Sequence, residues 1–357
     1  MGFKCGIVGL PNVGKSTLFN ALTSSKNAQA ENFPFCTIDP NIGIVDVPDT
    51  RLNNLSVISK SSKKINANIT FVDIAGLVKG ASKGEGLGNK FLSHIRGVDA
   101  IVHLVRCFDS ENIQHVNKRI DPINDLETIK TEILLADIKQ IEKKLEKNAK
   151  KKLTEKQIKL LNEILARLNE AESFDISYDS ENKKFLTEIG LISNKPYIIV
   201  CNVDEQSVRD GNNYTKLLKE KYSNQKFVSI CADIESQIID LKLDERENYM
   251  KNIGLEKTGL DKLITSGYDL LNLNTFFTSG PKETRAWTIK KNTAAQKAAG
   301  VIHSDFEKNF IRAEVVSYND FEKYGGFEKA KENGKLRVEG KNYFVNDGDV
   351  LIFRVNP

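Results

Sequence analysis

Residues 9–16 read Gly-Leu-Pro-Asn-Val-Gly-Lys-Ser, and this stretch decides the fold class. It matches the pattern G-x-x-x-x-G-K-[ST], whose two glycines let the backbone turn tightly, so that its N–H groups face phosphate oxygens. The ammonium of Lys15 would lie on the β- and γ-phosphates of a nucleotide, and the hydroxyl of Ser16 would coordinate Mg²⁺. An apolar run precedes the motif and a helical pattern follows it, which would direct the positive end of a helix dipole at the phosphates. The motif therefore predicts a phosphate-binding loop rather than an ordinary glycine-rich turn.

Apolar segments around this loop predict an α/β domain. Short apolar runs read as strands at 3–8, 42–47, 69–74, 100–107, 196–201 and 227–230. The run at 100–107 is almost entirely apolar, as expected of a strand that is buried on both faces. Because these runs alternate with helical patterns, we expect a mostly parallel sheet with helices on both faces.

Two further segments carry residues suited to a nucleotide-bound Mg²⁺. Asp73 ends a predicted strand and begins the sequence Asp-Ile-Ala-Gly. In P-loop enzymes an Asp at this point holds Mg²⁺, usually through water, and the N–H of the glycine, here Gly76, meets the γ-phosphate. Thr37 lies between the two motifs, where a switch-loop Thr that completes the Mg²⁺ shell is expected. We therefore predict Ser16, Thr37 and Asp73 as metal ligands.

The residue that follows this second motif is informative about hydrolysis. Ras-type GTPases place there a Gln that orients the attacking water, whereas this chain has Leu77, which cannot form that hydrogen bond. Either another group positions the water or hydrolysis is slow. His94, which follows a glycine-rich segment, is one candidate, although a lone His is more often structural. Asn12 offers another route, because an Asn in this loop can help bind a monovalent cation such as K⁺, which would offset charge in the transition state.

Residues 202–205 read Asn-Val-Asp-Glu, where GTPases carry N-K-x-D. In that motif the Asp accepts two hydrogen bonds from guanine, and the Lys stem stacks over the base. Val203 has no long stem, and the carboxylate of Glu205 lies one methylene further out. Because a site built on hydrogen bonds loses discrimination when they are misplaced, we infer relaxed or ATP-preferring specificity. Ser229 begins Ser-Ile-Cys-Ala, a plausible equivalent of the S-A-K-like loop that contacts the base.

Two parts of the chain depart from the α/β pattern. From 126 to 174 there is no Pro or Gly, and apolar residues recur every three or four positions, which predicts two long helices in an antiparallel hairpin. Residues 143–159, at its tip, hold eight Lys and two Glu, a local charge of +6 that fits either a contact surface or a well-solvated turn. After about residue 280, strand-like runs separated by short glycine turns predict a small α+β domain.

Composition limits the classes of function. The 357 residues include 52 Lys and Arg against 48 Asp and Glu, a net charge of +4, which argues against a histone-like basic coat but leaves room for a local basic patch. No apolar run reaches the roughly 18 to 20 residues that span a bilayer, and the start lacks the features of a signal peptide. Five cysteines without a C-x-x-C pair make a disulfide framework or a zinc ribbon unexpected. We expect a cytoplasmic monomer with reduced thiols and no membrane segment.

Taken together, these residues resemble the YchF/Obg-like ATPase family of P-loop GTPases. The resemblance is carried by 9–17, 32–41, 73–92 and 202–205 and by stretches at 310–314 and 347–350, so it covers essentially the whole chain. It implies an Obg-type G domain at 1–124 and 190–278, a helical coiled-coil insertion at 125–189, and a C-terminal TGS domain of β-grasp fold at 279–357. It also implies ATP hydrolysis in preference to GTP, with Mg²⁺, and association with ribosomes through the large subunit or the 70S particle.

Residue roles follow from the same resemblance, position by position. It implies that the loop contacts the phosphates, that Ser16 and Thr37 bind Mg²⁺, and that Val203 lies beside adenine through its backbone. The family has also been linked to redox control, which makes Cys36, beside Thr37, the thiol to suspect. The predicted nucleotide-contacting residues are Asn12, Val13, Gly14, Lys15, Ser16, Thr17, Asn202, Val203, Glu205 and Ser229, and the predicted catalytic residues are Lys15, Gly76 and His94.

Two functions of different classes stay open at this point. One is a slow, Mg²⁺-dependent ATPase whose nucleotide state switches the loops around Thr37 and Gly76. The other is an RNA- or ribosome-binding module that uses nucleotide mainly as a structural ligand, with the basic hairpin tip and the C-terminal domain as its contact surface. An ordinary GTPase is disfavoured by Val203 and Glu205.

Overall fold

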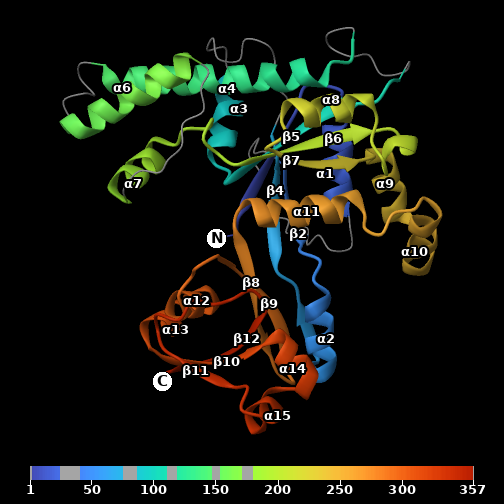
Figure 1. The fold of residues 1–357 in the computed structure, drawn as a ribbon, viewed down its shortest axis with the longest axis vertical. Coiled ribbons are helices and arrows are strands. Elements are labelled where there is room, and N and C mark those ends of the chain that lie inside the picture. Colours follow the sequence, from blue (N-terminus) through green and yellow to red (C-terminus); the bar gives the residue numbers. More distant parts are fainter. Residues whose placement is uncertain are drawn as a thin grey trace. The chain divides into compact units, whose positions relative to one another are not determined.

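The computed structural model describes residues 2–24, 41–74, 87–110, 119–146, 153–170 and 180–356. The chain divides into two compact units. One comprises Phe3–Gly43 and Thr70–Leu263, and the other comprises Ile44–Ile69 and Ile264–Pro357. Each unit has its own sheet (Figure 1).

The first unit is built around a six-stranded sheet with the strand order β2-β4-β1-β5-β6-β7. The strands are β1 (Lys4–Val8), β2 (Asn41–Asp46), β4 (Asn68–Asp73), β5 (Ala100–Cys107), β6 (Tyr197–Val203) and β7 (Lys226–Ile230). β1 pairs in parallel with β4 and β5, and β6 pairs in parallel with β5 and β7. All eight residues of β5 are buried, so the strand predicted from its apolar run lies at the centre of the core. The predicted parallel α/β sheet is confirmed.

Helices complete this unit: α1 (Lys15–Ser24), α3 (Leu87–Arg96), α8 (Asn213–Lys221), α9 (Ala232–Asp240) and α10 (Leu243–Asn252), together with the 3₁₀ turn η2 (Glu205–Ser207). The division between the units falls within α11 (Gly259–Leu270), after Leu263. α1 contacts α9, which places the helix after the phosphate-binding loop beside the helix after β7. Cys5, Cys107 and Cys201 are buried and act as small core residues, as predicted, whereas Cys36 lies outside the described residues. None of the described helices is long and apolar enough to cross a bilayer.

The predicted pair of helices is present as α4 (Pro122–Leu145) and α6 (Glu155–Asn169), which pack together (Figure 1). The carboxylate of Asp121 accepts a hydrogen bond from the N–H of Asn124 and so begins α4, with Pro122 at its first position. A capping box between Thr154 and Gln157 begins α6. Their apolar faces form a cluster with α7 (Ser180–Ile189), a helix that the sequence pattern did not single out.

The second unit is α+β, as predicted. Its six-stranded sheet has the order β11-β10-β12-β8-β9-β3, with strands β3 (Lys63–Ile65), β8 (Leu273–Ser279), β9 (Glu283–Lys290), β10 (Phe310–Ser317), β11 (Arg337–Glu339) and β12 (Asp349–Val355). β12 pairs in parallel with β8, whereas β8 with β9 and β10 with β12 are antiparallel. Helices α12 (Ala295–Ile302), α13 (Ser304–Lys308), α14 (Tyr318–Tyr324) and α15 (Phe327–Glu332) follow, and α12 packs its alanines on the sheet core.

The segment between β2 and β4 joins this second unit, although the expected boundaries assign it to the nucleotide-binding domain. It holds α2 (Thr50–Ile58) and β3, and β3 pairs in parallel with β9 at the edge of the C-terminal sheet. The guanidinium of Arg51 donates to the carboxylate of Asp347 at 2.6 Å, and the Ser61 and Thr284 hydroxyls lie 2.7 Å apart. The three-domain division therefore stays a prediction, while the contacts group residues 44–69 with the C-terminal strands.

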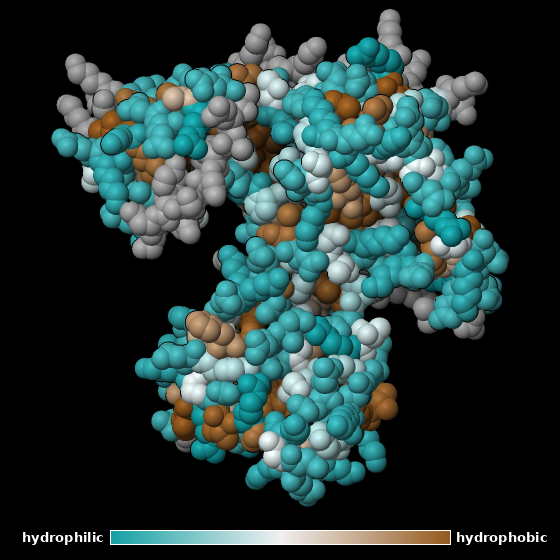
Figure 2. Space-filling view, in the orientation of Figure 1, coloured by the Kyte–Doolittle hydropathy of each residue, from teal (hydrophilic) through white to brown (hydrophobic). Residues whose placement is uncertain are grey.

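Most of the visible surface is hydrophilic, and hydrophobic residues appear on it in small groups (Figure 2). The exposed large hydrophobic side chains among the described residues are Ile42, Val57, Leu135, Leu217, Val301, Ile311, Val338 and Phe344.

Candidate functional site

A pocket of about 940 Å³ lies at the carboxyl ends of the parallel strands. Its lining comes from residues 10–12 and 14–17, 108–110 after β5, 202–205 at the end of β6, and 231–233 after β7. Open α/β sheets bind ligands at this edge, and the volume lies at the upper end of the range for small-molecule sites. The residues predicted independently from the two nucleotide motifs therefore meet in one cavity.

Backbone geometry in the loop depends on glycine. Gly14 has φ +93°, and a Cβ added there would lie 2.4 Å from Nδ2 of Asn202. A Cβ on Gly9 would lie 2.8 Å from the Leu104 carbonyl oxygen, because the loop passes close to β5. Val13 is fully buried and anchors the loop in the core. Only its backbone is therefore available to a ligand.

Lys15 and Asp73 form an ion pair where the loop faces the end of β4. Their side chains are only 13% and 11% exposed, and Asp73 sits opposite Ile7 of β1 in the sheet. A cation that can neutralise phosphate and a carboxylate that suits Mg²⁺ are thus side by side. Ser16 lines the same pocket, whereas Thr37 and Gly76 lie outside the described residues.

The side chain of Asn202 connects the two nucleotide motifs. Its Nδ2 donates to the carbonyl oxygen of Val13 at 3.0 Å, and its Oδ1 accepts from the N–H of Ala232 at 3.1 Å. It is only 4% exposed. Asn202 therefore holds the phosphate loop against the start of α9, and it also lines the pocket, where its predicted contact with the nucleotide stays a prediction.

The next residues divide between the core and the pocket. Val203 is 2% exposed and belongs to a hydrophobic cluster with Leu218 and Cys231, so its side chain offers the pocket no stacking stem. Asp204 caps the turn η2, because its carboxylate accepts from the N–H of Ser207 at 2.9 Å. Glu205 is exposed and lines the pocket, where its carboxylate is available to a ligand.

Comparison with known proteins identifies the family to which a chain with this pocket belongs. A family model described as "50S ribosome-binding GTPase" matches residues 4–137, and the model YchF-GTPase_C, described as a protein of unknown function, matches 273–356. Proteins named "Ribosome-binding ATPase YchF" from Bacillus subtilis and Escherichia coli O157:H7 are 48% and 47% identical, with full coverage of both chains. The chain belongs to the YchF family. The solved YchF GTPase of Schizosaccharomyces pombe is 36% identical, with a TM-score of 0.87 over 99% of this chain and 98% of that one.

The YchF assignment confirms the resemblance found in the sequence and the P-loop fold class. Four predicted site residues among those described are nevertheless absent from the pocket lining: Val13 and Asp73, whose places are given above, and Ser229 and His94. Ser229 is inside β7, paired with Cys201, and the residues that reach the pocket follow it at 231–233. His94 lies in the last turn of α3, where its Nδ1 is buried without a hydrogen-bond partner in the described part of the chain.

Sequence reasoning missed the pocket residues that follow β5 in this YchF chain. Arg106 is 1% exposed, and its Nε donates to the carbonyl oxygen of Phe108 at 3.1 Å, with the guanidinium 4.6 Å from the ring centre. The hydroxyl of Tyr214 donates to the Asp109 carboxylate at 3.0 Å. Phe108 thus presents a held aromatic side chain to the pocket. The available signal was its position directly after a fully buried parallel strand.

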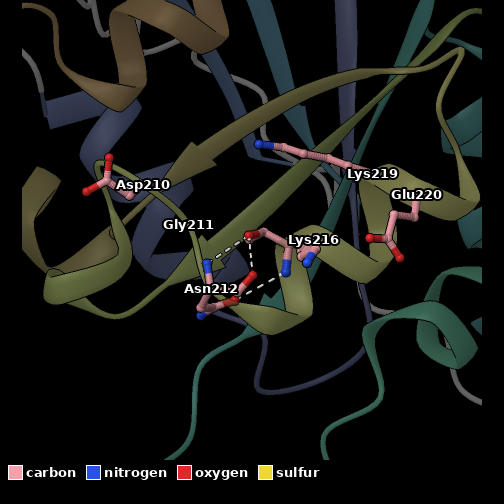
Figure 3. Close-up of a pocket in the computed structure, with 7 residues that line it drawn as sticks. Asp210, Gly211, Asn212, Lys216, Lys219 and Glu220 are labelled. Atoms are coloured by element: carbon pink, nitrogen blue, oxygen red, sulfur yellow. Dashed lines mark hydrogen bonds between the residues drawn. The ribbon is translucent and has the colours of Figure 1, made fainter.

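A second hollow of about 540 Å³ lies at the start of α8 (Figure 3). The hydrogen bonds drawn there belong to the capping box of the helix. Oδ1 of Asn212 accepts from the N–H of Thr215 at 3.2 Å, and the Thr215 hydroxyl donates to the Asn212 carbonyl oxygen at 2.8 Å. These polar groups therefore serve helix initiation, and the hollow carries no candidate function.

Proposed function

We propose that this chain is a Mg²⁺-dependent ATPase that prefers ATP to GTP, binds ribosomes and acts as a nucleotide-dependent regulatory switch. The observation that carries the base preference is the burial of the Val203 side chain in the core, while Glu205 is exposed on the pocket lining. The relatives that match over their full length are named ribosome-binding ATPases, which supports both the reaction and the partner.

The base preference follows from two guanine-binding features that residues 202–205 do not provide in the described pocket lining. Burial of Val203 leaves no stem to stack over guanine, and Glu205 carries its carboxylate one methylene beyond the position of an Asp. Hydrogen-bonded discrimination falls steeply when a partner is misplaced, so guanine loses its main advantage. Phe108 provides an aromatic side chain on the same pocket, and it serves either purine.

The phosphate end supports Mg²⁺ binding. Within the described residues no group of three or more His, Cys, Asp or Glu side chains could hold a metal alone, so the ion would be shared with the nucleotide. Ser16 and Asp73 would hold it, with Thr37 as the further predicted ligand, and bound Mg²⁺ would neutralise phosphate charge. Lys15 would exchange its contact with Asp73 for phosphate oxygens. Asn12 lines the pocket with φ +64°, where it would serve the K⁺ route to water activation.

Calorimetric titration of nucleotide-free protein with ATP and with GTP, each with Mg²⁺, tests this proposal. We expect tighter binding of ATP. A matched variant, Glu205→Asp, restores the shorter carboxylate and should recover part of the affinity for GTP. Tighter binding of GTP by the unchanged protein would show that Glu205 still reads guanine, and would make the chain a GTPase of the same fold.

Ribosome binding, through the large subunit or the 70S particle, would use basic residues of the helical insertion. The predicted tip residues Lys150, Lys151 and Lys152 lie outside the described residues, but Lys143 and Lys144 occupy the last turn of α4. Neutralising the three tip lysines should weaken cosedimentation with ribosomes and flatten its dependence on salt. Unaltered cosedimentation would remove the tip from the interface.

The domain assignments belong to the same proposal: the G domain, the coiled-coil insertion, and a TGS domain supported by the mixed sheet around the parallel pair β8 and β12. We also propose a cytoplasmic monomer. The competing function is an RNA-binding module that uses nucleotide as a structural ligand. Measuring ATP turnover with and without ribosomes distinguishes this module from the ATPase. Turnover that stays negligible in both conditions would favour the module.

A further inference from the structure

A third pocket, of about 370 Å³, lies between α4 and the strands β5 and β6. We call it the α4 pocket, and its lining includes His103, Lys130, Leu134, Lys195 and Tyr197. It shares no lining residue with the nucleotide pocket. Its apolar walls also include Ile133 and Ile192, so the polar groups in it stand against a hydrophobic surface.

His103 is a polar group without a partner in this pocket. Its side chain is on β5, the residue is 2% exposed, and its Nδ1 has no hydrogen-bond partner among the described residues. The ring packs edge-on against Tyr197, with centroids 5.3 Å apart. Burial, aided by the charge of Lys130, lowers the pKa of His103 to about 3, so the imidazole is neutral at physiological pH. Buried polar atoms in native proteins are nearly always hydrogen-bonded, so a water or a ligand is expected at this nitrogen.

The same pocket holds a lysine, Lys130, that shares its nearby carboxylate with a second lysine. The Lys130 ammonium lies 5.7 Å from the ring centre of Tyr197 and 5.0 Å from that of Tyr222. Glu127 is the carboxylate of the lining, and the charge of Lys130 helps to lower its pKa, but it also accepts from the Tyr222 hydroxyl and pairs with Lys221 at 3.1 Å. One carboxylate therefore serves two lysines, Lys130 and Lys221, and net positive charge is left for a ligand.

We propose that the α4 pocket is a second ligand site, which takes a small aromatic monoanion with its charged group at Lys130 and a hydrogen bond to His103. The anionic group would neutralise the charge of Lys130, and the aromatic ring would pack against Leu134 and the aliphatic walls. A buried water alone would satisfy His103, but it would leave the apolar walls and the lysine uncovered. The volume of the pocket suits a molecule with one aromatic ring or two fused rings, and it is too small for a nucleotide with its phosphates.

The test uses 2-naphthoate as the probe and the full-length protein saturated with Mg²⁺ and ADP, so that the nucleotide pocket stays filled. Calorimetry should give saturable binding with a Kd of about 1 mM or tighter. The neutral isostere 2-naphthamide should bind at least about tenfold more weakly, because the charge-assisted contact is lost. The chain has four histidines, so ring NMR signals can be resolved, and those of His103 should shift with the probe.

Lys130→Met should weaken 2-naphthoate binding about tenfold and leave 2-naphthamide unchanged. Lys139→Met, an exposed position on the same helix outside the pocket, is the matched control and should bind as the unchanged protein does. Leu134→Trp fills the pocket and provides a second route if Lys130→Met fails to fold. Absence of saturable binding, or equal affinity in the unchanged protein and both pocket variants, would overturn the proposal.

Discussion

Nδ2 of Asn202 lies 2.4 Å from the place that a Cβ on Gly14 would occupy. The same nitrogen donates to the carbonyl oxygen of Val13, so the loop and the end of β6 are in contact through two consecutive backbone positions. The buried amide of Asn202 therefore fixes the path of the phosphate-binding loop from behind. A change in either partner should reach the nucleotide even though neither side chain needs to touch it.

Gly14→Ala should destabilise the protein by about 1 to 2 kcal/mol and abolish tight ATP binding, because φ +93° disfavours an L side chain and the new methyl displaces Asn202. Urea denaturation and ATP titration measure the two effects. Gly280→Ala is the matched control, since an added Cβ there meets no atom within 4 Å. Equal affinity for ATP in both variants would contradict the role given to this contact.

Lys15→Ala should abolish hydrolysis and weaken nucleotide binding, because it removes the ammonium that neutralises the phosphates. Turnover with saturating ATP and Mg²⁺ is the measurement. Lys216→Ala, on α8 and outside the nucleotide pocket, is the control and should turn over normally. Undiminished turnover in Lys15→Ala would end the ATPase assignment.

Glu235→Gln should change how stability depends on pH. Burial raises the pKa of the Glu235 carboxyl from 4.5 to about 7, while one of its oxygens accepts from the N–H of Gly259 at 2.6 Å. Between these values the folded protein binds a proton more readily than the unfolded chain, so the contribution of Glu235 to the free energy of unfolding falls as pH rises through this window.

Gln keeps the acceptor for Gly259 and cannot ionise, so the pH slope of stability should flatten in Glu235→Gln. Urea denaturation at about pH 5 and about pH 8 measures that slope. Glu220→Gln, at an exposed position of α8, is the control and should follow the unchanged protein. A slope in Glu235→Gln that equals the slope of the control would contradict this account.

Arg51→Met should lower the stability of the second unit by about 1 to 2 kcal/mol. The substitution removes the charge-assisted bonds from Arg51 to Asp49 and Asp347, while a long aliphatic side chain still covers Phe277. Differential scanning calorimetry measures the loss. Arg119→Met serves as the control, because its side chain is 74% exposed. Loss of the same size in both variants would show that the partners of Arg51 contribute nothing specific.

The sequence predicted those parts of the molecule whose structure depends on residue types close together in the chain. The phosphate-binding loop needs glycine at fixed places, and the strand at 100–107 needs burial on both faces, so both were readable from residue types. Phe108 was not predicted, because its role depends on Arg106 holding it at the pocket. The predicted base-contacting stretch began at Ser229, which lies inside β7, whereas Cys231 and Ala232 of the same stretch line the pocket, since spacing alone does not show where β7 ends.

The segment at 63–65 illustrates another limit. It reads Lys-Lys-Ile and has no alternating apolar pattern, yet it forms β3. Its strand conformation comes from pairing with β9, which lies far away in the sequence, and local propensity carries no record of such a partner.

The pairing of β3 with β9 also sets the order in which parts of the chain can fold during translation. Ser61 and Thr284, joined through their hydroxyls, are 223 positions apart. At about 5 to 20 residues per second, roughly 10 s or more of translation must pass before the earlier residue meets its partner. During that interval Leu52 and Leu55 of α2, both fully buried in the finished protein, have no C-terminal strands to cover them. The nascent chain therefore carries an unfinished apolar helix through most of its own synthesis, and the last third of the chain closes a structure that its first seventy residues began.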